Sequence, residues 1–120
     1  MVFVYCNKIL TRIDPNDIMY IEALRDYIKI FLKDKSYIVH CTLKNSLEHL
    51  PKNFIRVHKS YVINTDFIES LSRTTYKIKI GESIIPCGEF YIKDLLTALP
   101  IFGTFKHKEL KNQIKDNNNN

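Results

Sequence analysis

Short runs of Val, Ile, Tyr and Phe, separated by polar breaks, constrain the fold of this chain more than any other feature. Successive side chains of a β-strand point to opposite faces, so a strand with one buried face alternates apolar and polar residues. The segment 27–33 alternates in this way, with an apolar face made of Ile28, Ile30 and Leu32. The pattern predicts a chain built mainly from β-strands.

Turn residues divide the chain into a series of predicted strands. The run Asp14-Pro15-Asn16-Asp17 is a turn by composition, and Asn7 is typical of a hairpin turn. The segment 18–23 is apolar at both sets of alternate positions, which predicts a central strand covered on both faces. Besides 18–23 and 27–33, we expect strands at residues 2–6, 8–13, 36–41, 54–58, 67–73, 75–80 and 83–86.

Two short helices interrupt this pattern. Thr42 is a suitable N-cap for the first helix, and Pro51 ends it. The apolar face of this helix consists of Leu43, Leu47 and Leu50. The second helix stops at Pro100, and its apolar residues at helical spacing are Ile92, Leu95, Leu96 and Leu99. We expect both helices to pack against the sheets of a mainly β fold.

The positive charge is concentrated in one part of the chain. The formal net charge is +5, from 18 basic and 13 acidic residues. Residues 52–79 carry six basic and two acidic side chains, and residues 106–120 carry four basic and two acidic side chains. The net charge of all other residues is −1. A concentrated basic region suits a phosphate backbone, although many soluble domains carry a basic face without a polyanionic partner.

Residues suited to catalysis do not converge in the sequence. His40 and Cys41 are adjacent, so in a strand they would point to opposite faces and could not act as base and nucleophile. Asp14 and Asp17 flank a proline and are typical turn residues. Because the chain has three glycines, no phosphate-binding loop and no metal-ligand spacing, we expect no enzyme activity, no cofactor and no metal site.

Composition also bounds the domain organisation and the compartment. We expect residues 1–105 to form one domain and residues 106–120, rich in Lys and Asn, to form a partly disordered tail. No apolar run approaches the roughly 20 residues that span a bilayer, and the N-terminal segment lacks the features of a signal peptide. We therefore expect a cytoplasmic protein without a membrane partner. The three cysteines, which are too widely spaced to suggest a disulfide framework, are expected to be small buried hydrophobic residues: Cys6, Cys41 and Cys87.

A more specific pattern lies in the segment FIRVHKSYVIN at residues 54–64. Together with DIMYIEALRDYIKI (17–30), TLKNSLEHLP (42–51) and SIIPCGEFYIKDLL (83–96), this segment closely resembles the LytTR family of bacterial DNA-binding domains. The resemblance covers residues 2–100, with the segments in the right order and spacing. It implies elongated antiparallel β-sheets with two short helices, which bind DNA through loops that enter successive major grooves.

By this resemblance, base contacts come from three loops. The residues that would face DNA are Arg25, Asp26 and Tyr27 in the first loop, Lys59 with its neighbours His58 and Ser60 in the second, and Cys87, Gly88 and Glu89 in the third. Family members commonly carry a basic residue near the third position, where this chain has Glu89. A glutamate cannot make the bidentate contact of an arginine to guanine. Either this loop reads a different base, with Glu89 accepting from a cytosine amino group, or the loop contributes little and Lys93 supplies charge at the groove edge.

Several of these residues also have a structural interpretation. In an extended segment Arg56, His58 and Ser60 would share a face that could hold phosphates. Alternatively, Arg56 and His58 would form internal hydrogen bonds that fix the following turn. Internal bonding and phosphate contact are equally compatible with Asn64, and Lys77 is either a phosphate ligand or part of a solvated strand face. Arg25 and Asp26 could equally be plain turn residues.

The predicted function is sequence-specific binding of double-stranded DNA, as the output module of a bacterial two-component transcriptional regulator. By resemblance, a receiver domain would precede this domain, and two copies would bind imperfect direct repeats as a homodimer. A receiver domain does not fit within 120 residues, so we expect an excised domain or a free-standing regulator. The alternative is a protein-interaction module on the same fold, with DNA binding altered through Glu89 and a surface supplied by some of its seven Tyr and seven Phe residues.

Overall fold

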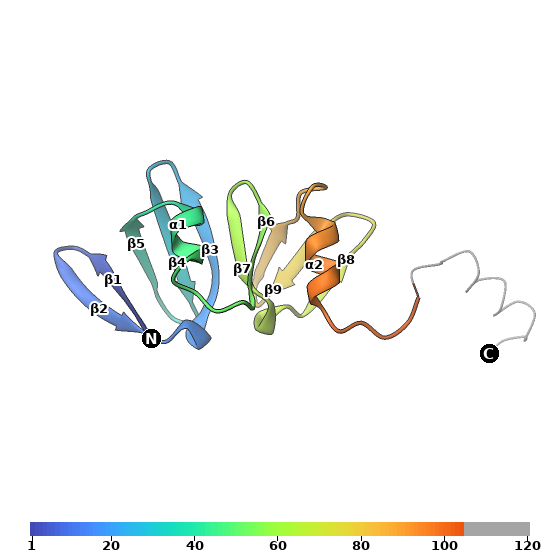
Figure 1. The fold of residues 1–120 in the computed structure, drawn as a ribbon, viewed down its shortest axis with the longest axis horizontal. Coiled ribbons are helices and arrows are strands. Elements are labelled where there is room, and N and C mark those ends of the chain that lie inside the picture. Colours follow the sequence, from blue (N-terminus) through green and yellow to red (C-terminus); the bar gives the residue numbers. More distant parts are fainter. Residues whose placement is uncertain (105–120) are drawn as a thin grey trace, which may run out of the picture.

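The structure, a computed structural model, describes residues 1–104, in which antiparallel β-sheets dominate (Figure 1). The strands are β1 (Val2–Cys6), β2 (Ile9–Ile13), β3 (Ile18–Leu24), β4 (Tyr27–Leu32), β5 (Ser36–His40), β6 (Phe54–His58), β7 (Tyr61–Asn64), β8 (Ser70–Ser72), β9 (Lys77–Ile80) and β10 (Ser83–Pro86). The two helices are α1 (Leu43–Leu47) and α2 (Ile92–Ala98). This architecture confirms the predicted fold class. The tail expected at residues 106–120 lies outside the described residues.

The central sheet has five strands in the order β5-β4-β3-β7-β6. As predicted from its apolar residues on both faces, β3 lies in the middle of this sheet. Neighbouring residues of β3 and β7 pack into different cores, Ile21 and Val62 into one and Tyr20 and Ile63 into the other. The sheet is therefore covered on both faces.

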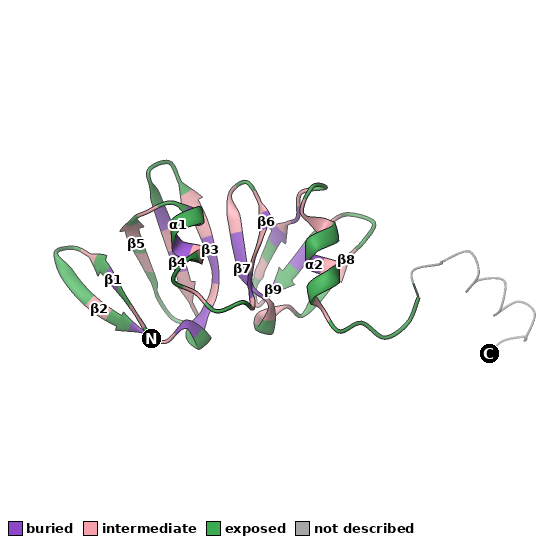
Figure 2. Cartoon of the chain, in the orientation of Figure 1, coloured by how far each residue is buried: buried purple, intermediate pink, exposed green. Residues whose placement is uncertain are grey.

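Each core has its own covering elements. The first core lies between the central sheet, the β1–β2 hairpin and α1, which contribute Val4, Ile13 and Leu43. The second lies between the sheet, the three-stranded sheet β10-β9-β8 and α2, whose Leu95 is fully buried. Stacking these layers one after another gives the elongated shape in Figure 1. Figure 2 shows exposed residues in the connecting turns, along the β1–β2 hairpin and on the outer sides of the helices.

Local sequence accounts for the ends of several elements. Asn7 and Lys8 join β1 to β2 with φ angles of 53° and 65°, the mirror-image hairpin turn that Asn favours. Lys8 therefore lies in the turn and not in the strand expected at 8–13. The Oγ1 of Thr42 accepts a hydrogen bond of 3.0 Å from the amide of Asn45, which confirms the predicted cap of α1.

The segment after β7 departs from the predicted hairpin of residues 67–73 and 75–80. The Asn64 side chain accepts from the amide of Asp66 and starts a 3-10 turn at Thr65–Phe67, so β8 is shorter than expected. Tyr76 has a φ of 57°, which places it in the connection before β9. In the described part of the chain, no helix is long and apolar enough to cross a membrane.

The prediction that the cysteines are buried holds for one of the three. Cys87 is buried in the second core, whereas Cys6 and Cys41 are half-buried. Cys6 ends β1 beside the β1–β2 turn, and Cys41 follows the edge strand β5. Cys41 packs against the edge of the first core, whereas Cys6 belongs to neither core.

Candidate nucleic-acid interface

The three connections expected to face DNA lie along one edge of the elongated molecule (Figure 1). They are the β3–β4 turn at residues 25–26, the β6–β7 turn at 59–60, and the loop 87–91 between β10 and α2. The first two are two-residue hairpin turns, because Leu24 pairs with Tyr27 and His58 pairs with Tyr61. The fold therefore brings together three segments that are far apart in the sequence.

Arg25 occupies a strained position at the tip of the first turn. Its φ of 58° lies in the left-handed region that glycine adopts without strain. The side chains of Arg25 and Asp26 are exposed. Tyr27 is half-exposed and its ring packs edge-on against that of His40, with the centroids 5.1 Å apart. Asn7, Lys8 and Tyr76 adopt the same region of backbone conformation in their turns.

Lys59 is exposed at the tip of the second turn, and its neighbours hold the backbone around it. Arg56 donates from Nε to the carbonyl oxygen of His58 at 3.2 Å and from Nη2 to that of Lys59 at 2.6 Å. The Nδ1 of His58 accepts a hydrogen bond of 3.0 Å from the amide of Ser60. The internal hydrogen bonds of Arg56 and His58 are therefore present, as one of the two interpretations of the sequence predicted.

The expectation that Arg56, His58 and Ser60 share one face of a strand is wrong. The strand ends at His58, the pairing register shifts between Arg56 and His58, and the chain reverses at Lys59 and Ser60. Ser60 is half-buried, and its carbonyl oxygen accepts a hydrogen bond of 2.9 Å from the amide of Ala23. Ser60 thus fixes the second turn against β3.

A hydrogen bond also ties the strands behind the first two turns. The hydroxyl of Tyr61 on β7 donates to Oε2 of Glu22 on β3 at 3.1 Å. Burial raises the pKa of Tyr61, and the hydrogen bond to Glu22, the negative charge of Glu22 and the nearby Tyr20 raise it further. The phenol therefore stays protonated at neutral pH and can keep donating this bond.

The third loop begins inside the protein. Cys87 is buried, its amide donates to the carbonyl oxygen of Tyr76 at 2.8 Å, and burial raises the pKa of its thiol. The expectation that this loop presents Cys87 to DNA is therefore wrong. The amide of Gly88 donates to the carbonyl oxygen of Val57 at 2.7 Å and so ties the loop to β6.

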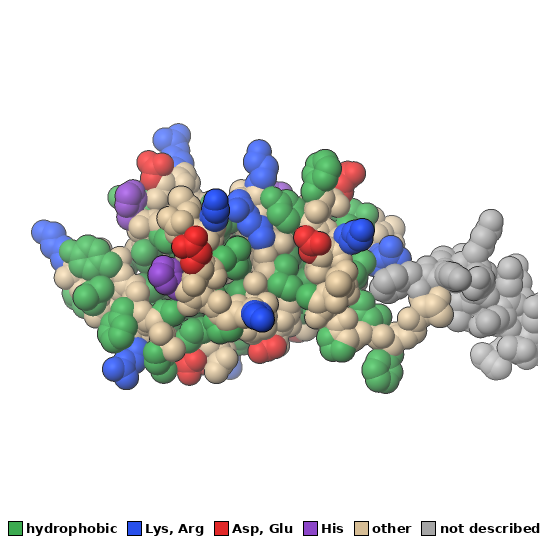
Figure 3. Space-filling view, in the orientation of Figure 1, with side chains coloured by type: hydrophobic (Ala, Val, Ile, Leu, Met, Phe, Trp, Pro, Cys, Tyr) green, Lys and Arg blue, Asp and Glu red, His purple; other side chains and the backbone are tan. Residues whose placement is uncertain are grey.

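The exposed part of the third loop consists of Glu89 and Phe90. Phe90 is 93% exposed, which the sequence could not indicate, because the strand and helix patterns assign most aromatic residues to the core. Figure 3 shows basic side chains at the first two tips, with an acidic side chain beside the first, and hydrophobic and acidic side chains without a basic one at the third. The third tip therefore differs in chemistry from the other two.

Two predicted lysines are accessible near this loop. Lys77 is exposed on β9 while its neighbour Ile78 is fully buried, so the predicted alternation is confirmed. Lys93 is exposed on α2, shortly after the third loop. Both ammonium groups can reach solvent.

Asn64, expected as a residue that either contacts phosphate or bonds internally, is 0% exposed. Its Nδ2 donates to the carbonyl oxygen of Ile18 at 2.9 Å. Its Oδ1 accepts from Asn53 at 2.8 Å and from the amide of Asp66 at 2.9 Å. Phosphate contact is excluded because the side chain is fully buried, and its three internal hydrogen bonds make Asn64 a structural residue.

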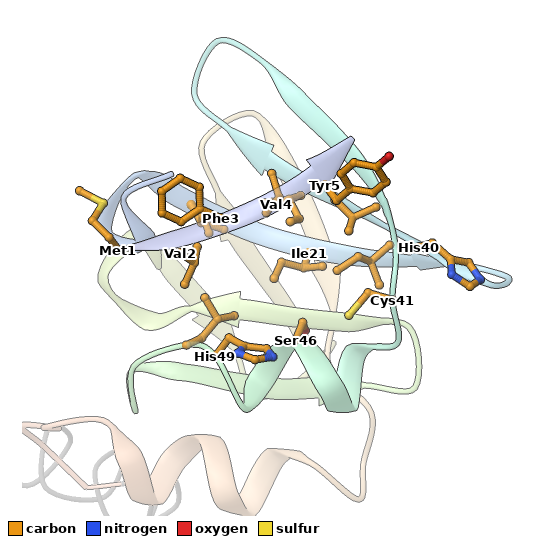
Figure 4. Close-up of a pocket in the computed structure, with 15 residues that line it drawn as sticks. Met1, Val2, Phe3, Val4, Tyr5, Ile21, His40, Cys41, Ser46 and His49 are labelled. Carbon is orange, nitrogen blue, oxygen red and sulfur yellow. The ribbon is translucent and has the colours of Figure 1, made fainter. Parts of the chain in front are cut away.

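A cavity of about 460 Å³ lies between β1, the central sheet and α1 (Figure 4). Its lining is mainly aliphatic, with Val2, Val4 and Ile21 among the residues that form it. Figure 4 shows the imidazole of His40 and the thiol of Cys41 directed apart, as their adjacent positions predicted. Within residues 1–104, no group of three or more His, Cys, Asp or Glu side chains could hold a metal ion.

Comparison with known sequences gives matches that span most of the chain. A family model described as "LytTr DNA-binding domain" matches residues 8–100. The "Sensory transduction protein LytT" of Bacillus subtilis (strain 168) is 34% identical over 94 residues. This alignment covers 74% of the chain and 39% of the relative, so the chain spans well under half the length of that protein.

A solved structure has the same fold. The LytTr DNA-binding domain of a methyl-accepting/DNA response regulator from Bacillus cereus superposes with a TM-score of 0.72, at 19% sequence identity. The superposition covers 83% of this chain and 96% of that domain. Nearly the whole solved domain is therefore reproduced here.

Proposed function

This chain belongs to the LytTR family of DNA-binding domains, and we propose that it recognises a specific sequence of double-stranded DNA through the three connections on one edge. The observation that carries this proposal is the placement of Arg25 and Lys59 at the tips of two hairpins that project from the same edge. The major groove, about 12 Å wide, admits a two-stranded β-ribbon. Each hairpin is such a ribbon with a cation at its end.

The first two turns supply the base contacts in this proposal. The ammonium of Lys59 donates to the O6 and N7 atoms of guanine, and Arg25 can do so in bidentate fashion. Asp26 accepts from a cytosine amino group, and the phenol of Tyr27 contacts the groove edge. His58 and Ser60 act by holding the backbone of the second turn in place.

The third loop reads DNA by a different chemistry. Gly88 allows the backbone to approach the groove, Glu89 accepts from a cytosine amino group, and the exposed ring of Phe90 contacts a thymine methyl group. Lys93 and Lys77 contact phosphates on either side of the loop, and this attraction offsets the repulsion between Glu89 and the DNA backbone. This assignment explains how the loop can lack a basic residue at its tip.

We further propose that the domain is the output module of a bacterial two-component regulator that acts in the cytoplasm. The B. subtilis relative is named as a sensory transduction protein and is longer than the region matched here, which leaves room for a receiver domain in such a protein. Two copies would bind direct repeats as a homodimer. One DNA-reading edge per copy suits a repeated half-site.

Selection of duplexes from a randomised pool tests the proposed recognition. We expect enrichment of a site with two similar half-sites in the same orientation. A pool that keeps its random composition after several rounds, at low salt, would show that the chain does not read a DNA sequence. Weak binding alone would not, because phosphate contacts bind any duplex.

The outer face of the β1–β2 hairpin favours a second function, contact with another protein. Tyr5 and Leu10 pair across the strands, and Phe3 lies on the same face; they are 60%, 67% and 60% exposed. Exposed apolar patches of this kind mark protein contacts. This hairpin lies at the end of the molecule away from the third loop, so the two surfaces need not compete (Figure 1).

Replacing both Tyr5 and Leu10 by Ser tests this surface. If this surface joins two copies of the domain on DNA, the variant should bind a single half-site as the wild type does but lose cooperative binding to two half-sites. Unchanged cooperativity would remove the hairpin from the homodimer contact.

A further inference from the structure

A second concave site lies beside the first turn, close to β6 and the start of α1. This pocket of about 200 Å³ is lined by residues from β3, β4, β6 and the start of α1. Three of the lining side chains are cationic: Arg25, Lys44 and Arg56. They come from segments far apart in the sequence, so the fold assembles the cluster.

The charge of this pocket is not balanced within the described structure. None of its nine lining residues is acidic. Among residues 1–104, no carboxylate oxygen lies within 4.0 Å of the charged nitrogens of these three side chains, whereas Lys79 and Glu69 form such a pair at 3.7 Å. Gathering three cations without a counter-charge is unfavourable by itself and favours an anion from solution.

The pocket walls hold the cations in place. Thr42 caps α1, so the backbone that carries Lys44 is fixed two residues earlier. The guanidinium of Arg56 is anchored by bonds to two backbone carbonyl oxygens, which use two of its five N–H groups and leave its charge intact. The side chain of Lys44 is exposed. The site is therefore partly preorganised and open to a ligand.

We infer that this pocket binds one phosphate of the DNA backbone, at the point where a strand passes between the grooves entered by the first two turns. The inference rests on the proposed function and extends it, because it assigns a DNA contact to α1, a helix whose sequence indicates packing alone. Lys44 neutralises the phosphate from one wall and Arg56 from another, and the charge of Arg25, whose guanidinium reads the neighbouring groove, adds to the attraction. This contact sets the register of the domain on the duplex and carries no sequence information.

The test compares the salt dependence of DNA binding in Lys44→Gln, the wild type and a matched control. Lys33→Gln is the control, because Lys33 is an exposed lysine in the β4–β5 connection, at the opposite edge of the central sheet. Each neutralised phosphate contributes about 0.9 to the slope of log K against log salt. We expect Lys44→Gln to lower the slope by about one and to weaken binding to selected and scrambled duplexes by the same factor. Lys33→Gln should match the wild type.

Neutral methylphosphonate groups, placed one at a time in the selected duplex, locate the contact. One position between the two grooves should weaken wild-type binding more than it weakens binding by Lys44→Gln. A wild type that binds selectively while Lys44→Gln keeps the same slope and the same methylphosphonate profile would overturn this inference alone. A wild type that binds no duplex selectively would overturn the proposed function and this inference together.

Discussion

The guanidinium of Arg56 donates a hydrogen bond of 2.6 Å to the carbonyl oxygen of Lys59, the residue at the tip of the second turn. A second bond, from Nε to the carbonyl oxygen of His58, fixes the plane of the same guanidinium. The backbone that carries the exposed Lys59 is therefore held in place by Arg56, a second cation three residues earlier. A substitution that removes the hydrogen-bond geometry of Arg56 and one that removes a positive charge should therefore have separable effects on DNA binding.

Arg56→Lys keeps the charge but loses the planar fork that joins two carbonyl oxygens. We expect binding to the selected site to weaken more than binding to a scrambled duplex, with the salt slope unchanged. The free energy of unfolding should fall by about 1–2 kcal/mol through the lost hydrogen bonds. Arg12→Lys, on the β1–β2 hairpin, is the control. Equal weakening on both duplexes would show that Arg56 acts by charge alone.

Asn64→Ala removes three hydrogen bonds from a fully buried site and leaves the carbonyl oxygen of Ile18 without its donor. We expect the free energy of unfolding to fall by about 2–3 kcal/mol, measured by urea denaturation. Asn16→Ala, at an exposed turn position, should change it by less than about 0.5 kcal/mol. A variant of Asn64 that is as stable as the wild type but fails to bind DNA would restore the phosphate role.

Phe90→Ala should cost binding at one thymine of the selected site. Burial of one methyl group contributes about 0.8 kcal/mol, or about fourfold in affinity. Replacing thymine by uracil at each position in turn removes that methyl group. Wild-type binding should weaken at one position in the third groove segment, and binding by Phe90→Ala should not. If uracil has no effect at any position, Phe90 does not read thymine.

Stability should decline at alkaline pH in part through Tyr61. Burial raises the pKa of this phenol above its usual value of 10.0, so the folded state binds the proton more tightly than the unfolded state. Its contribution to stability is therefore complete below pH 10.0 and is lost as pH rises through the folded-state pKa. Tyr61→Phe should be less stable than the wild type at pH 8, and its stability should fall less steeply above pH 10. Parallel curves would contradict this assignment.

Much of the fold could be predicted because its signals are local. The alternation of Ile78 and Ile80 with lysines identifies the buried and exposed faces of β9, and Thr42 marks the start of α1. Apolar residues at both alternate positions identify β3 as the central strand. These patterns depend on neighbouring residues, which the sequence displays directly.

The details of the interface could not be predicted because they depend on contacts between distant residues. Asn64 is engaged by Ile18, 46 residues earlier, and Gly88 is tied to Val57. The cluster around Lys44 likewise needs three segments to meet. The resemblance to a family located the three loops, but it could not tell which of their side chains face inward.

Binding of Lys59→Ala to the selected and scrambled duplexes at two salt concentrations, followed by fluorescence anisotropy, tests the groove-reading role of the second turn most directly. The wild type should prefer the selected site, with affinity that falls steeply as salt rises. Lys59→Ala should lose about 1–3 kcal/mol of that preference while still binding the scrambled duplex. Full selectivity in the variant would contradict the placement of Lys59 in the groove.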